Sequence, residues 1–161
     1  MGWRMIGKPI MTSEMSGIPT VTQKFNSMSG TNDYLLKSVI CGIIFYNDPA
    51  FTDIYLEIWS DRSGAAQKLI ATSNSIPKSE CLLVEDHAFR QIGFSFDSAI
   101  PLRAQTPYHL AIRASGYTGT NASHVAARLS YPDPQYGNII TKDATQAATH
   151  PFDFVLVSAD M

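Results

Sequence analysis

Hydrophobic and polar positions alternate with a period of two along most of this chain, and a helical period is nearly absent. Such alternation indicates strands with one buried face, and turn-forming residues recur about every 8–12 positions between them. The pattern predicts an all-β sandwich or barrel of eight or nine strands. The predicted strands are residues 20–26, 35–46, 53–61, 67–73, 81–85, 88–97, 108–115, 124–131 and 152–158.

Two of these segments also predict which side chains are buried. In DIYLEIWSD (53–61), alternation places Ile54, Leu56 and Ile58 on the core face. Tyr55, Glu57 and Trp59 fall on the opposite face. The segment LLKSVICGIIFY (35–46) is apolar on both faces beyond Val39, which is typical of a central strand that is covered on both sides.

The first twenty residues are apolar but follow no period. Several Gly and Pro residues disfavour regular strand pairing there, and no unbroken apolar stretch has the length of a secretion signal. We expect an extended N-terminal arm (1–20) that contacts a neighbouring subunit, followed by one sandwich domain (21–161). A strand of the chain's own domain is the alternative. The expected partner-binding residues of the arm are Trp3, Met5, Ile6, Ile10, Met11 and Met15.

Charge and cysteine content exclude several classes of protein. The net charge is −2, and the twelve Lys and Arg residues form no cluster, so a nucleic-acid-binding surface is not expected. The longest apolar run is far shorter than the roughly 20 residues that span a bilayer. Cys41 and Cys81 lack a C-x-x-C spacing, which favours buried, reduced thiols of a cytoplasmically made protein, although a bridge between them stays open.

The stretch LEIWSD (56–61) carries the most enzyme-like pattern, because Glu57 and Asp61 share one strand face. A retaining glycosidase needs its two carboxylates about 5–5.5 Å apart. Four residues of extended strand separate Glu57 from Asp61 by about 13 Å. We therefore expect no sugar hydrolysis here, and no other segment offers a catalytic motif.

Metal-binding patterns are equally absent. The four histidines lie in separate segments, and in EDHAF (85–89) alternation would point Asp86 away from Glu85 and His87. We expect neither a metal nor a cofactor. A calcium site between the loops 61–64 and 132–138 stays open, although Asp and Asn side chains in loops commonly bond to their own backbone instead.

The outer face of Tyr55, Glu57 and Trp59 has two interpretations. Two aromatic rings beside a carboxylate can stack on a sugar while the carboxylate accepts hydroxyl hydrogen bonds. Alternatively a second sheet, the N-terminal arm or a neighbouring subunit covers the face, since aromatic residues are common in interface cores. The second interpretation is favoured, so Tyr55 and Trp59 join the expected partner-binding residues.

The order of segments resembles a known group of folds over roughly residues 34–158. YLLKSVICGIIFY, IYLEIWSDRSGAAQKLIATS, IGFSFDSAIPLRAQTPYHLAIRAS and FDFVLV follow one another as in the jelly-roll domains of phage virion proteins and of carbohydrate-binding-like modules. The shared features are an L-x-I-x-S-D strand that turns into L-I-A-T-S, and an F-x-F strand followed by T-P-Y-H-L-A-I. The resemblance implies an antiparallel jelly roll.

Together these expectations describe a non-enzymatic structural protein of a virion, made in the host cytoplasm. It would decorate or cement the outside of a phage head, with the major capsid protein or neighbouring copies as partners and a homo-oligomeric arrangement within the assembly. The alternative is a carbohydrate-binding or receptor-binding module of a fibre or surface protein. In that case Tyr55, Glu57 and Trp59 would bind sugar.

Overall fold

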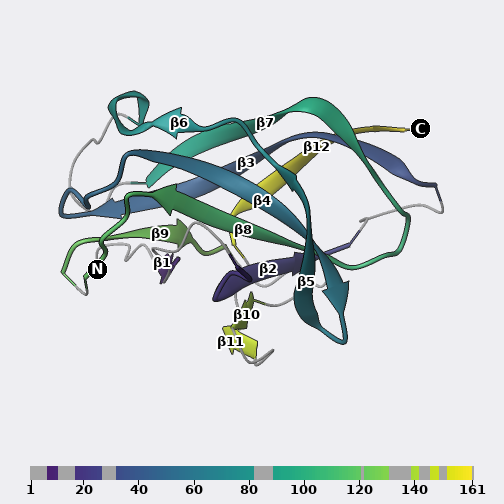
Figure 1. Cartoon of the computed structure of the whole chain (residues 1–161), viewed down its shortest axis with the longest axis horizontal. Coiled ribbons are helices and arrows are strands. Elements are labelled where there is room, and N and C mark those ends of the chain that lie inside the picture. The colour runs from purple at the N-terminus through teal and green to yellow at the C-terminus, as the bar shows by residue number, and fades with distance from the viewer. Residues whose placement is uncertain are drawn as a thin grey trace.

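The chain folds into two antiparallel β-sheets that pack face to face (Figure 1). The structure is a computed structural model, and it describes residues 7–10, 17–26, 32–81, 89–120, 122–130, 139–141, 146–148 and 152–160. Within these ranges the only helical element is a single 3-10 turn, Lys78–Glu80. The all-β sandwich expected from the alternating pattern is therefore confirmed.

The first sheet has five strands arranged around β3. Its β7 lies along one edge of β3, and β9 and β12 follow one another along the other edge, with β1 outside β9. The strands are β1 (Gly7–Pro9), β3 (Tyr34–Tyr46), β7 (Phe89–Leu102), β9 (His124–Arg128) and β12 (Phe154–Asp160).

The second sheet has seven strands, and β8 lies at its centre between β2 and β4. Beyond β2 come β10 and then β11, while β5 and β6 both pair with β4. The strands are β2 (Val21–Phe25), β4 (Asp53–Arg62), β5 (Ala65–Thr72), β6 (Ile76–Pro77), β8 (Tyr108–Ser115), β10 (Ile139–Thr141) and β11 (Gln146–Ala148).

The core between the sheets follows the alternation in the sequence. Ile54, Leu56 and Ile58 are completely buried, as their phase in β4 predicts. Every residue of 41–45 in β3 is also buried, which confirms that this half of the strand is covered on both faces. Cys41 and Cys81 are both buried and both free thiols.

One buried polar side chain links the two sheets. Gln23 of β2 is fully buried, and its Oε1 accepts a hydrogen bond of 2.7 Å from the backbone N–H of Phe152, just before β12. Its Nε2 donates to the carbonyl of Lys24. Because both ends of the amide are bonded, a glutamine in the core costs little of the usual penalty for burying a polar group.

Several boundaries differ from those predicted. The described residues contain twelve strands, of which eight are longer than three residues; the extra ones are the short β1, β6, β10 and β11. Strand β7 continues to Leu102, five residues beyond the predicted end at residue 97, and Pro101 lies opposite Leu35 of β3. Proline is tolerated there because β7 is an edge strand. Most of the predicted strand 81–85 lies outside the described residues.

Part of the predicted arm belongs to the chain's own sandwich. Residues Gly7–Pro9 form β1 and pair with β9, and Ile10 is only 3% exposed within the main core. Pro9 fits because β1 is an edge strand, where a missing N–H leaves no ladder bond unmade. The alternative expectation, a strand of the chain's own domain, therefore holds for residues 7–9, and Ile10 packs within the same core.

Candidate functional site

The face of β4 opposite the core is the candidate site, because the sequence placed three chemically interesting side chains there. The structure brings Tyr55, Glu57 and Trp59 together on that face as predicted, but it buries them: their exposed fractions are 7%, 4% and 6%. A ring that stacks on a sugar must present an open face. The sugar-binding interpretation of these three residues therefore lacks the exposure that it needs.

A buried ion pair lies at the centre of this face. The register pairs Tyr55 of β4 with Arg113 of β8, so Glu57 is the diagonal neighbour of Arg113. Arg113 Nε lies 2.5 Å from Glu57 Oε1, and Trp59 Nε1 donates a longer bond of 3.3 Å to the same oxygen. The carboxylate is thus neutralised and held in place by its neighbours.

Arg113 also ties down the segment that precedes β2. Its Nη2 donates a 2.5 Å hydrogen bond to the carbonyl of Gly17, a residue with a positive φ of 90° that glycine adopts without strain. The backbone at Gly17 therefore lies over the outer face of the seven-stranded sheet.

The hydroxyl of Tyr55 lies on this buried face as well. Burial raises the pKa of this hydroxyl, and the negative charge of Glu57 raises it further.

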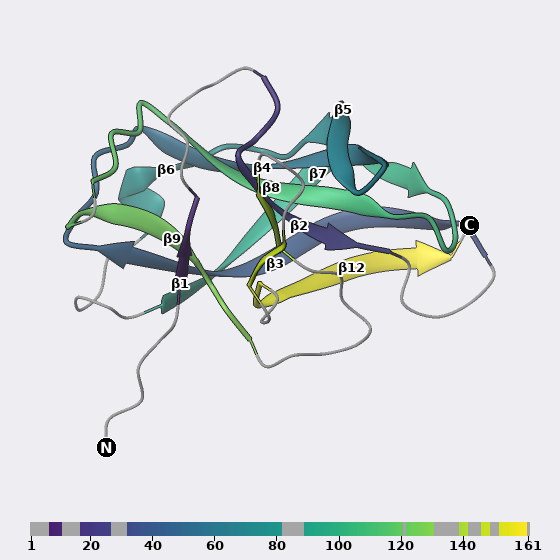
Figure 2. The same cartoon turned by 90° about the horizontal axis from the view of Figure 1, so that it is seen from below.

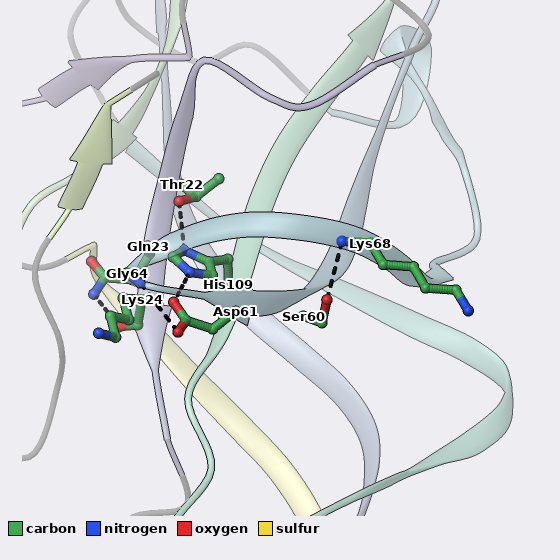
Figure 3. Close-up of polar contacts among 8 residues, drawn as sticks. All are labelled: Thr22, Gln23, Lys24, Ser60, Asp61, Gly64, Lys68 and His109. Carbon is green, nitrogen blue, oxygen red and sulfur yellow. Dashed lines mark hydrogen bonds and ion pairs between the residues drawn. The ribbon is translucent and has the colours of Figure 1, made fainter. Parts of the chain in front are cut away.

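A second polar cluster, around His109, lies further along the same face, because the register pairs His109 with Trp59. Figure 3 shows its hydrogen bonds. His109 of β8 is fully buried; its Nε2 lies 2.7 Å from Asp61 Oδ1, and its Nδ1 lies 2.8 Å from Thr22 Oγ1 of β2. The backbone N–H of Gly64 donates to the other oxygen of Asp61. Three strands, β2, β8 and β4, thus contribute to one line of hydrogen bonds.

The protonation of His109 follows from its partners. Asp61 as a carboxylate only accepts, so Nε2 carries the proton and Nδ1 accepts from the Thr22 hydroxyl. Burial lowers the pKa of His109 below its ordinary value, and this outweighs the opposing effect of Asp61. The imidazole is therefore neutral at neutral pH.

Threonine, histidine and aspartate in a line have the composition of a catalytic triad. A neutral imidazole that accepts from a hydroxyl can in principle activate it as a nucleophile. Thr22, however, is 2% exposed and His109 is 0% exposed, so a substrate carbonyl cannot approach the hydroxyl. We interpret the line as a structural network that joins β2, β8 and β4.

The other sequence candidates do not come together. Among the described residues no group of three or more His, Cys, Asp or Glu side chains is placed to hold a metal. His124 bonds through Nδ1 to the carbonyl of Thr120 and packs against the ring of Tyr46. The remaining candidates lie outside the described residues: Trp3, Met5, Ile6, Met11, Met15, Glu85, Asp86, His87, Asp133 and His150.

Sequence reasoning missed three members of this buried face: Thr22, His109 and Arg113. A signal was present, because YHLAIRAS carries His109 and Arg113 in the same phase and four residues apart, as LEIWSD carries Glu57 and Asp61. Because the two basic residues and the two acidic residues have the same spacing, they face each other if the two strands pair. The pairing itself, between segments about fifty residues apart, was not available from one sequence.

Comparisons with known proteins add nothing to this geometry: no family model, no curated protein and no solved structure matches the chain.

Proposed function

We propose that the protein is a non-enzymatic structural component of a virion, a decoration or cement protein on the outside of a phage head. The observation that carries the proposal is the burial of the charged face. Glu57, Arg113, His109 and Thr22 bond to one another or to the backbone, and all are at most 4% exposed. The charges of Glu57 and Arg113 and the hydrogen-bonding groups of His109 and Thr22 are used within the fold, so they are not available to bind or transform a substrate.

A sandwich whose charged groups are paired internally is suited to a structural component that binds through the shape of its surface. Each copy of such a protein contributes a modest binding energy, and symmetric repetition over a shell multiplies it. The jelly-roll topology is part of the proposal. It is supported by the repeated passage of the chain between the two sheets, as from β3 to β4 and then from β7 to β8 and on to β9.

The proposed contact surface differs from the one expected from the sequence, because Tyr55, Trp59 and Ile10 are buried in the chain itself. Two exposed apolar side chains lie on the outer side of the seven-stranded sheet instead. Ile18 is 58% exposed and follows Gly17, while Leu69 is 42% exposed and pairs with Trp59. We assign the contact with the particle to this side.

The test is co-sedimentation of the purified protein with particles from its source. We expect the wild-type protein to sediment with the particles to a fixed number of copies, and a double variant, Ile18→Asp with Leu69→Asp, to lose at least tenfold in affinity. Gln91→Asp, an exposed change on the other sheet, is the matched control and should bind normally. Wild-type protein that stays in the supernatant with every particle fraction contradicts the proposal.

A carbohydrate-binding module remains the alternative from the sequence. It would need a site other than Tyr55, Glu57 and Trp59, because the rings of these residues are covered. Retention of the wild-type protein on a glycan array, together with failure to bind particles, would favour it.

A further inference from the structure

The residues directly before β2, 17–20, form a strap on the outer face of the seven-stranded sheet. Figure 2 shows this strap in dark purple, on the side of β4 and β8 that faces away from the five-stranded sheet. Pro19 is buried within the strap, whereas Gly17 is exposed and Ile18 is 58% exposed. Side-chain burial therefore holds the strap mainly at Pro19.

At Gly17 the backbone makes the contact with the sheet. Its carbonyl accepts the 2.5 Å hydrogen bond from Arg113 Nη2. The φ of Gly17 is 90°, which glycine adopts readily and residues with a Cβ rarely adopt. A Cβ added at Gly17 would meet no atom within 4 Å, so the need for glycine is conformational and not steric.

Arg113 is suited to hold this carbonyl because its guanidinium group is already fixed. The side chain is 1% exposed, and its Nε bonds to Glu57 Oε1. A guanidinium group is a rigid, planar fork that donates through several nitrogens at once. One side chain of β8 thus connects the carboxylate of Glu57 on β4 with the strap, through two different nitrogens.

We propose that Arg113 is a positioning residue, whose hydrogen bond to Gly17 holds Ile18 in the orientation in which it contacts the particle. Ile18 lies between two fixed points, the bonded carbonyl of Gly17 and the buried Pro19. A contact residue whose backbone is fixed in advance loses less conformational freedom on binding. The role of Ile18 rests on the proposed function, whereas the fixation of the strap does not.

The variant Gly17→Ala releases the strap without changing the Arg113–Glu57 pair. Alanine is strained at a φ of 90°, so the backbone relaxes and the carbonyl moves away from Arg113. Gly64 provides the matched control, because its φ is also 90° and a Cβ added there also meets nothing within 4 Å. Gly64→Ala places the same strain in the turn between β4 and β5 instead.

The first measurement needs no particles. A nitroxide spin label is attached to the variant Ile18→Cys, and its mobility is recorded by electron paramagnetic resonance. Cys41 and Cys81 are 1% and 2% exposed, so the wild-type protein should not take up the label. We expect a slow spectrum for Ile18→Cys alone and with Gly64→Ala, and a shift to the fast component with Gly17→Ala.

Arg113→Lys removes the other partner of the hydrogen bond and keeps a positive charge beside Glu57. A lysine has a single nitrogen, so pairing with Glu57 leaves the Gly17 carbonyl without this donor. We expect the same shift to a fast spectrum at position 18. Circular dichroism establishes which variants are folded, and Gly17→Ala decides alone if Arg113→Lys does not fold. A label that stays slow in every folded variant overturns the inference.

The second measurement is co-sedimentation with particles, on proteins that retain Ile18. We expect Gly17→Ala to bind about threefold to tenfold more weakly than the wild type, the cost of ordering one further side chain on binding. Gly64→Ala should bind normally. An unchanged affinity of Gly17→Ala, or an equal loss in Gly64→Ala, overturns the positioning role of Arg113. Wild-type protein that binds no particle contradicts the proposed function instead, and the spin-label result then decides whether Arg113 fixes the strap.

Discussion

Arg113 Nε lies 2.5 Å from Glu57 Oε1, and both side chains are almost completely buried on the face of the sheet that does not line the core. Burying two charges is costly, and close pairing with further hydrogen bonds offsets the cost. Here Trp59 and the carbonyl of Gly17 supply those bonds. The second face of the sheet thus buries this charge pair beside a small apolar cluster of Trp59, Ala66 and Ala111.

Removing one partner of this pair should be strongly destabilising. Arg113→Met leaves a buried carboxylate unpaired, so we expect a loss of about 3–5 kcal/mol in the free energy of unfolding, measured by urea denaturation. Arg128→Met is the control, because the Arg128–Asp153 pair is about one-third exposed and should contribute only about 1 kcal/mol. Equal losses of stability in the two variants would show that the buried pair contributes no more than the partly exposed pair.

His109 should make stability depend on pH. Its pKa is lowered in the folded protein, so the unfolded chain binds the proton more readily, and stability falls as the pH drops below the unfolded value of about 6.5. The hydrogen bond and negative charge of Asp61 oppose this lowering of the His109 pKa, and the positive charge of Lys24 adds to it. We expect the urea midpoint to fall more between pH 7.5 and 5.5 for the wild type than for His109→Gln. Identical pH profiles would contradict the assignment.

Ile10 should contribute to the core of its own domain. Ile10→Ala removes a buried side chain, and we expect a loss of about 2–5 kcal/mol in the free energy of unfolding. Ile18→Ala, at a position that is 58% exposed, should change it by less than about 0.5 kcal/mol. An Ile10→Ala protein as stable as the wild type would return this segment to the role of a separate arm.

Two tyrosines make a matched pair for the cost of an unsatisfied hydroxyl. Among the described residues Tyr34 Oη is buried with no hydrogen-bond partner, and burial raises the pKa of Tyr34 to about 12. Tyr34→Phe should therefore stabilise the protein by about 1 kcal/mol.

In contrast, Tyr117 Oη accepts a hydrogen bond from the buried N–H of Val125. Tyr117→Phe should destabilise by about 1–2 kcal/mol, because it leaves that N–H unsatisfied. Differential scanning calorimetry of the two variants gives the signs directly. A loss of stability in Tyr34→Phe would show that its hydroxyl does have a partner.

The alternation of side chains was sufficient to predict the long strands and the core face of β4. It could not predict β1, because a three-residue edge strand that contains Pro9 has no periodic signal of its own. Its partner, β9, lies more than a hundred residues away. Short strands form where a longer strand offers an edge, and that information lies in the tertiary structure rather than in the local pattern.

The sequence predicted where the candidate site lies but not that its side chains are buried. The sequence placed Tyr55, Glu57 and Trp59 on one face, and the structure agrees. Whether that face is exposed depends on what covers it, and the carbonyl of Gly17 on Arg113 is a contact between residues 96 positions apart. No local pattern contains such a contact.

The central position of β3 has a consequence for how the protein is made. All the strands that pair with β3, namely β7, β9 and β12, come later in the chain. The first of them, β7, ends 56 residues after Tyr46, which corresponds to roughly 3–11 s of synthesis at the usual rates. Until then the apolar run VICGIIFY has neither edge paired, and an exposed apolar strand of this kind is prone to aggregate.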